Sequence, residues 1–280
     1  MNHTETAYAK INIALHVRRK RSDGYHDIET VFAFCADGDI VTAKPAEELT
    51  LTIDGPFAAG LATTDNLVLD AARAIGVTAA LHLTKNLPVA SGIGGGSADA
   101  AAVLRLFPRH PGESRGPLSR TGNGTGGEMD PGVRRDDDFT KIAAKLGADV
   151  PACVVSRTMR GSGKGDDLTR LPSLAGTPVL LVNPRVPLST AAVFSSWDGK
   201  DRGPLGDWHD GRNDLETPAR RLVPQIGEVL EWLAAQPGAA LVRMSGSGAT
   251  CFALFGTMTS RDAAAARVPA DWWHLASVLR

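Results

Sequence analysis

The sequence is poor in cysteine and has no excess of either charge. Its 280 residues include 3 Cys, and 30 basic side chains balance 31 acidic ones, for a net charge of −1. Cys35, Cys153 and Cys251 are far apart, odd in number and form no C-x-x-C pair, so neither a disulfide framework nor a zinc cluster is predicted. Such cysteine usage favours a reducing cytoplasm, and the balanced charge argues against a nucleic-acid partner.

Long apolar runs are also missing. No uninterrupted apolar stretch approaches the roughly 20 residues that a bilayer span requires, and residues 1–10 lack the basic-then-apolar order of a secretory signal. Hydrophobic residues make up 43% of the chain and charged residues 22%, a composition typical of folded, soluble proteins. We therefore expect a globular cytoplasmic protein of one large or two modest domains, with no membrane partner.

Apolar periodicity predicts a mixture of strands and helices. Alternation over residues 8–17 predicts a strand on which Lys10 and Asn12 share the face opposite the core-directed aliphatic side chains. Later strands are predicted at 25–34, 50–53, 81–83, 178–182, 240–244 and 250–255, and helices at 65–75, 98–107, 139–146 and 222–235. Since the two types intermix without a regular βαβ rhythm, an α+β fold is expected.

One internal segment differs from the rest in composition. Residues 108–137 are rich in glycine, proline and charge, and only Leu118, Met129 and Val133 there are strongly apolar. Such a segment buries too little to offset the entropy of ordering it. We predict a disordered surface insertion.

A glycine-rich loop leads directly into a helix. Residues 88–97 (PVASGIGGGS) precede an alanine-rich helix former, and Ser97 is the predicted N-cap. Glycines let backbone N–H groups converge, and the helix N-terminus adds hydrogen-bond donors and the positive end of the helix dipole. Phosphate is therefore the expected ligand of this loop. The spacing matches neither a Walker A loop nor a Rossmann fingerprint. A flexible turn before a helix remains the alternative interpretation.

Two single residues carry weaker signals. Lys10 lies on a strand that otherwise faces the core, although a surface lysine would give the same pattern. Asp149, in the segment GADVP, is equally compatible with a turn or a helix cap. The acidic segment 207–214 contains one histidine, His209, with no second histidine at ligand spacing, and we interpret it as a solvated loop.

Five segments together resemble the GHMP kinase superfamily. They are YAKIN at 8–12, DGYH at 23–26, the loop and helix start at 88–101, GADVP at 147–151, and SGSGA at 245–249. They span nearly the whole chain in the order expected of that family. Two features depart from its pattern: the segment 108–137 stands where relatives have a short turn, and Ala98 replaces a residue that is often serine.

The resemblance implies a two-domain α+β kinase with its active site in the interdomain cleft. The domains would be residues 1–159, which bind ATP, and residues 160–280. The reaction would be phosphoryl transfer from ATP to a hydroxyl of a cytidine diphosphate sugar-alcohol. A GHMP kinase for another alcohol, of the homoserine or mevalonate type, and a non-catalytic ligand sensor with this fold are the alternatives.

Site residues follow from the same resemblance. Lys10 would supply positive charge and Asp149 would orient the acceptor hydroxyl. Mg²⁺ would bridge the phosphates, with Ser97 as its nearest protein hydroxyl, and Gly246 and Gly248 would close the site. The ATP-binding residues would be Pro88, Val89, Ala90, Ser91, Gly92, Ile93, Gly94, Gly95, Gly96, Ser97 and Ala98, with Asn66, Leu67 and Lys85 near the nucleoside. The substrate-binding residues would be Asn12, Tyr25, His26 and Phe194.

Overall fold

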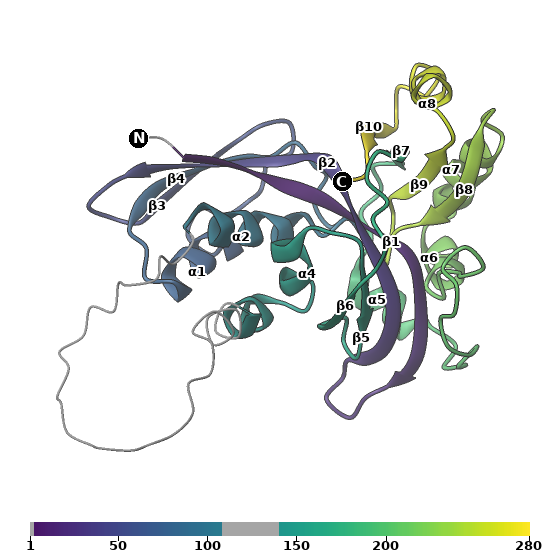
Figure 1. Ribbon diagram of the computed structural model, residues 1–280, viewed down its shortest axis with the longest axis horizontal. Helices are drawn as coiled ribbons and strands as arrows, with labels where there is room; N and C mark the ends of the chain where they lie inside the picture. The colour runs from purple at the N-terminus through teal and green to yellow at the C-terminus, as the bar shows by residue number, and fades with distance from the viewer. Residues whose placement is uncertain (1–2, 108–139) are drawn as a thin grey trace.

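The computed structural model describes residues 3–107 and 140–280, and these form two sheets, each with its own helices (Figure 1). This arrangement confirms the predicted α+β class. The segment 108–137, predicted to be disordered, lies outside the described residues. None of the described helices is long and apolar enough to cross a membrane.

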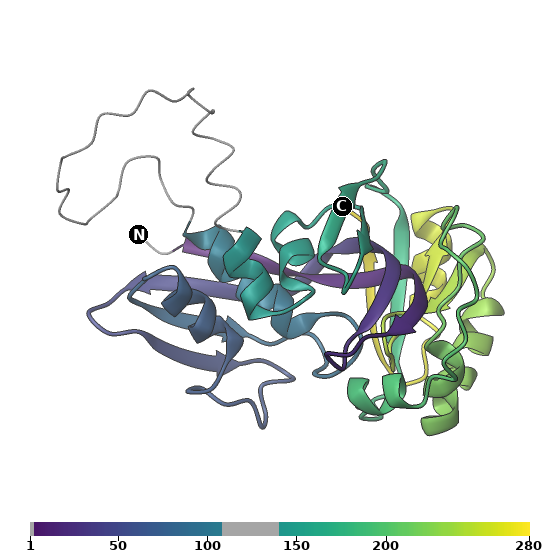
Figure 2. The ribbon, with the colours of Figure 1, turned by 90° about the horizontal axis from the view of Figure 1, so that it is seen from below.

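The first sheet is built around two long strands. β2 pairs antiparallel with β1 along most of its length. β2 is also the central strand of the order β3-β4-β2-β5-β6, in which β3 and β4 form a parallel pair. Both views show β1 running from the first sheet toward the second (Figures 1 and 2). The strand bounds are His3–Lys20 for β1, His26–Pro45 for β2, Thr50–Asp54 for β3, Ala79–Thr84 for β4, Met159–Ser162 for β5 and Asp167–Arg170 for β6.

Small side chains let the helices of this half approach the sheet closely. α2 (Gly95–Leu106) packs on β1, α1 (Leu67–Ala74) and α4 (Val150–Val155), and residues 140–146 are also helical. The alanines of α2 have no methyl exposed to solvent, and together with Val103 and Leu104 they complete the apolar core of this half. This close packing fixes the direction in which the N-terminus of α2 points.

The second sheet is entirely antiparallel, in the order β10-β7-β9-β8. The predicted helix 222–235 corresponds to α7, which begins at Gln225, and a separate helix that the sequence did not predict, α6, ends at Leu222. Pro224 disfavours helical backbone at Val223, which is extended and so separates the two helices. The bounds are Pro178–Asn183 for β7, Thr190–Ser195 for α5, Glu216–Leu222 for α6, Gln225–Ala234 for α7, Ala239–Met244 for β8, Cys251–Phe255 for β9, Met258–Ala265 for α8 and Trp273–Val278 for β10.

A shared core joins the two sheets. Ile11 and Ile13 of β1 are fully buried in one cluster with Leu181 of β7 and Phe252 of β9. β5 and β6 pair with the first sheet, which therefore extends to Arg170. The division into domains at residues 159 and 160 stays a prediction.

Candidate active site

A cavity of about 750 Å³ lies where the glycine loop, β1, α5 and the turn between β8 and β9 meet. Among its described lining residues are three lysines, Lys10, Lys20 and Lys164, and one carboxylate, that of Asp149. Such a balance favours a small anionic ligand. Fourteen of the predicted site residues line it, and Gly248 does not: Lys10, Asn12, Tyr25, His26, Leu67, Ala90, Gly92, Gly94, Gly95, Gly96, Ser97, Asp149, Phe194 and Gly246.

Lys10 and Asp149 form an ion pair at one side of the cavity. Lys10 Nζ lies 2.7 Å from Asp149 Oδ2 and donates a second hydrogen bond of 3.1 Å to Asn12 Oδ1. The Asn12 amide is itself oriented by a 2.8 Å bond to Thr30 Oγ1. The Lys10 side chain is 4% exposed and that of Asp149 34%, so the carboxylate is the member of the pair that a ligand can reach. Lys10 is therefore not the surface lysine that the sequence left open.

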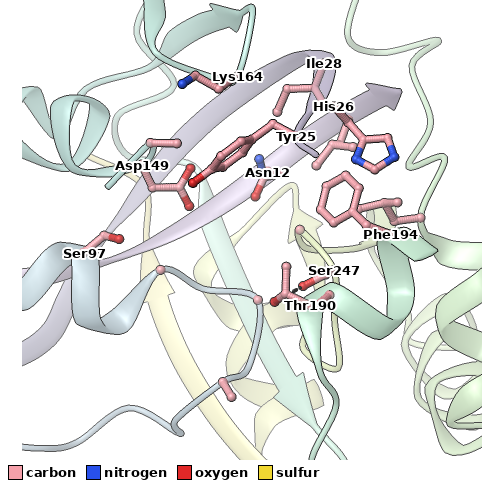
Figure 3. Close-up of a pocket in the computed structure, with 18 of the residues that line it drawn as sticks. Asn12, Tyr25, His26, Ile28, Ser97, Asp149, Lys164, Thr190, Phe194 and Ser247 are labelled. Atoms are coloured by element: carbon pink, nitrogen blue, oxygen red, sulfur yellow. Dashed lines mark hydrogen bonds between the residues drawn. The ribbon is translucent and has the colours of Figure 1, made fainter. Parts of the chain in front are cut away.

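The alternation of β1 explains this placement. Lys10 and Asn12 stand two residues apart, so both point to the side of the strand that faces the cavity. Asp149 occupies the N-cap position of α4, but its side chain makes no capping hydrogen bond. The carboxylate is turned to the cavity instead, where Figure 3 shows it beside Asn12 and Tyr25.

The glycine loop presents a helix N-terminus to the cavity. α2 begins at Gly95 with Gly94 as N-cap, so the predicted cap at Ser97 is wrong: Ser97 lies within the first turn and lines the cavity. Gly94 has a φ of +64°, and a Cβ there would lie 2.9 Å from Lys10 Cε. Only glycine allows the lysine and the loop to approach this closely. The first-turn amides have no intrahelical acceptors and can bind an anion.

Aromatic side chains form the other end of the cavity. Tyr25 is 57% exposed, and the centre of the His26 ring lies 4.8 Å from that of Phe194 (Figure 3). The centre of the Trp197 ring lies 5.7 Å from that of His26. Burial lowers the pKa of His26, and the charge of Lys20 lowers it further. A neutral imidazole between aromatic rings suits a flat heterocyclic base.

Sequence reasoning missed five polar residues of the cavity wall: Lys20, Lys164, Thr190, Ser195 and Ser247. Thr190 and Ser247 share a hydrogen bond of 2.8 Å, and Lys164 Nζ lies 4.9 Å from the centre of the Tyr25 ring. Thr190 could have been found from Phe194, because residues four apart lie on one face of a helix. Ser247 and Lys164 come from turns whose position depends on packing.

Several predicted ATP-binding residues do not line the cavity. Lys85 is buried beneath the loop, 2.5 Å from Asp39 Oδ2 and 2.6 Å from Asp99 Oδ2. Asn66 caps α1 by accepting a bond from the Val68 N–H. Their predicted roles toward ATP stay predictions, as do those of Pro88, Val89, Ser91, Ile93 and Ala98, which belong to the loop and helix but not to the cavity wall.

Known proteins share both halves of this architecture. Residues 66–157 match the GHMP kinases N terminal domain and residues 200–273 the GHMP kinases C terminal domain. The chain therefore belongs to the GHMP kinase family, which is a family of ATP-using phosphotransferases. A homoserine kinase from Cytophaga hutchinsonii shares the fold, with a TM-score of 0.61 at 16% identity over 99% of this chain and 95% of that one.

More similar relatives share one name. A protein of Rhizorhabdus wittichii called 4-diphosphocytidyl-2-C-methyl-D-erythritol kinase is 54% identical, covering 100% of this chain and 96% of its own length. One of the same name from Novosphingobium aromaticivorans is 50% identical, covering 100% and 94%. A crystal structure of 4-(cytidine 5'-diphospho)-2C-methyl-D-erythritol kinase superimposes with a TM-score of 0.75 at 29% identity, covering 100% of this chain and 99% of that one.

Proposed function

We propose that the protein phosphorylates the 2-hydroxyl of 4-diphosphocytidyl-2-C-methyl-D-erythritol with ATP, in the non-mevalonate route to isoprenoid precursors. The observation that carries the proposal is the Lys10–Asp149 pair, 2.7 Å apart, facing the same cavity as the glycine loop and the aromatic end. A phosphate donor, an acceptor hydroxyl and a cytosine base each have a matching surface there. The high identity with relatives of this name supports the same assignment.

Each residue has a distinct task in this mechanism. The α2 N-terminus and loop amides bind the triphosphate, which holds the γ-phosphoryl group in place. Asp149 accepts a hydrogen bond from the acceptor hydroxyl and takes up its proton as the phosphoryl group moves. The Lys10 ammonium, fixed by Asp149 and Asn12, stabilises the negative charge that develops between donor and acceptor. Positioning and charge compensation supply most of the catalysis in such reactions.

The cavity also fits a phosphate-bound Mg²⁺. Magnesium keeps several waters and needs one or two protein oxygens besides the phosphates. Ser97 places a hydroxyl on the cavity wall at the α2 N-terminus, and the reachable carboxylate of Asp149 lies across from it (Figure 3). Ser97 would hold the ion, and the ion would supply charge neutralisation on the phosphates.

The aromatic end favours a cytidine nucleotide over the alternative acceptors. Homoserine and mevalonate contain no ring, so they would leave Tyr25, His26 and Phe194 without a stacking partner. A non-catalytic sensor would have no need for the Lys10–Asp149 pair. A cytoplasmic location is part of the proposal, supported by three cysteines that are all free thiols.

A substrate panel tests the proposal directly. The purified protein is incubated with Mg²⁺ and ATP plus 4-diphosphocytidyl-2-C-methyl-D-erythritol, homoserine or mevalonate, and the products are identified by mass spectrometry. We expect a phosphorylated product from the first compound only. Phosphorylation of either of the others in its place would refute the assignment, and no alcohol-dependent ATP use would favour the sensor.

Replacing the carboxylate tests the mechanism. Asp149→Asn preserves shape but removes the charge and the proton acceptor, so kcat should fall on the order of 10²- to 10⁴-fold. The affinity for CDP should stay within about threefold, because the base-binding end is unchanged. Asp70→Asn is the matched control: Asp70 is a partly exposed carboxylate that pairs with Arg73 on α1 and does not line the cavity. A kcat of Asp149→Asn close to that of the control would rule out the assigned role.

A further inference from the structure

One hydroxyl of the turn between β8 and β9 bonds two elements of the first half of the molecule. Ser245 is fully buried, and its Oγ donates a 2.8 Å hydrogen bond to Gly92 O and accepts one of 3.1 Å from the Asn12 N–H. Gly92 belongs to the glycine loop, while Asn12 follows Lys10 on β1. A side chain from the part of the chain that forms the second sheet thus bonds both the glycine loop and the strand that carries Lys10.

Three successive carbonyls of the loop are bonded to other elements. Ser91 O accepts from Thr250 N at 3.1 Å, Gly92 O from Ser245 Oγ at 2.8 Å, and Ile93 O from Lys10 N at 3.0 Å. Each of these bonds directs a carbonyl oxygen of the loop toward a donor of the protein itself. This matters because a phosphate-binding loop must direct N–H groups toward its anion, and a carbonyl oxygen directed there would repel it.

Gly92 is the one of these three residues whose orientation depends on a side chain. The carbonyls of Ser91 and Ile93 are held by backbone N–H groups, which no side-chain substitution removes. Gly92 has a φ of +78°, and glycine has the freest backbone of all residues. Its peptide is also packed tightly, since a Cβ there would lie 2.4 Å from Ser245 O and 2.7 Å from Gly248 O. The Ser245 hydroxyl is therefore the side-chain donor that holds the Gly92 carbonyl.

We propose that Ser245 is a positioning residue that locks the Gly92 peptide and so sets the glycine loop for nucleotide binding. It acts through Gly92 and does not itself line the cavity. The proposal rests on the proposed function in one respect, that the anion on the loop is ATP. Loss of the hydroxyl should weaken ATP binding and slow transfer, while the base-binding end stays intact.

Two variants and a control separate positioning from plain stability. Ser245→Ala removes the hydroxyl, and Ser245→Cys keeps nearly the same shape with a much weaker donor, so it carries the test if the alanine variant does not fold. Ser277→Ala is the control: Ser277 is 3% exposed, its hydroxyl bonds Asp37, and neither residue lines the cavity. Dissociation constants for ATP and for CDP are measured by calorimetry, together with the melting temperature.

We expect both Ser245 variants to raise the ATP dissociation constant on the order of tenfold, equivalent to about 1.4 kcal/mol, and to leave that of CDP within about twofold. Ser277→Ala should lower the melting temperature without changing ATP affinity. Equal losses for ATP and CDP, or ATP affinity as in the control, would overturn the proposal. Failure of the wild-type protein to bind CDP would count against the proposed function alone, because the ATP comparison would still test Ser245.

Discussion

The buried charges beneath the glycine loop make the stability of the protein depend on pH. Asp39 accepts three hydrogen bonds, from Lys85 Nζ, Asn86 N and Leu87 N, at 2.5, 2.6 and 2.8 Å. Asp99 accepts one, from Lys85 at 2.6 Å, and its Oδ1 has no partner among the described residues. Burial raises the pKa of Asp99 to about 7, since Lys85 only partly offsets burial and the charge of Asp39 adds to it.

The direction of the change in stability with pH follows from which state, folded or unfolded, holds the proton of Asp99. Between about pH 4 and pH 7 the folded protein keeps a proton on Asp99 that the unfolded chain releases, so stability falls as pH rises through this window. The free energy of unfolding falls by about 1.4 kcal/mol for each pH unit between pH 5 and the folded pKa of about 7, and it changes little above that pKa. The total loss from pH 5 to pH 8 is therefore about 3 kcal/mol. Although burial opposes its charge, the pKa of Lys85 is raised by Asp99 and Asp39, so Lys85 stays protonated throughout.

Asp99→Asn should remove this slope. Urea unfolding of the two proteins at pH 5, 6, 7 and 8, without nucleotide or metal, gives the free energy of unfolding at each pH. The variant should gain about 3 kcal/mol relative to wild type between pH 5 and pH 8. The lowered pKa values of His16 and His26 act in both proteins and cancel in the difference. Parallel stability curves would show that Asp99 does not hold a proton in this range.

Two further substitutions probe the geometry of the loops. Gly94→Ala places a Cβ 2.9 Å from Lys10 Cε at a φ of +64°. We expect the free energy of unfolding, measured by thermal unfolding, to fall by about 1–2 kcal/mol and kcat to fall at least about tenfold. A kcat like that of wild type would contradict the tight contact. Asn213→Ala removes Nδ2 bonds of 2.7 Å to Met244 O and 2.8 Å to Gly246 O, and should cost about 2 kcal/mol in urea unfolding. Unchanged stability would show that these buried carbonyls find other donors.

Short-range pattern was enough to predict several parts of the site. Alternation placed Lys10 and Asn12 on one face of a strand, and the glycine run predicted a helix N-terminus open to an anion. Both predictions use only residues within two or three positions of one another, and the local backbone conformation is set at that range. The helix start was nevertheless misplaced, because the helix begins after Gly94, which has a left-handed backbone and offers no side-chain cap, so it lacks the serine-cap signal that the prediction used.

Which residues far apart in the sequence contact one another is decided by the tertiary structure alone. Asp149 meets Lys10 across 139 positions, and the hydroxyl of Ser245 meets the Asn12 N–H across 233. Lys85, whose role toward ATP stays a prediction, pairs with two buried carboxylates that no sequence pattern connects to it. Such contacts depend on how the helices and sheets pack, and the packing energy is shared among many apolar side chains, none of which encodes a particular pair.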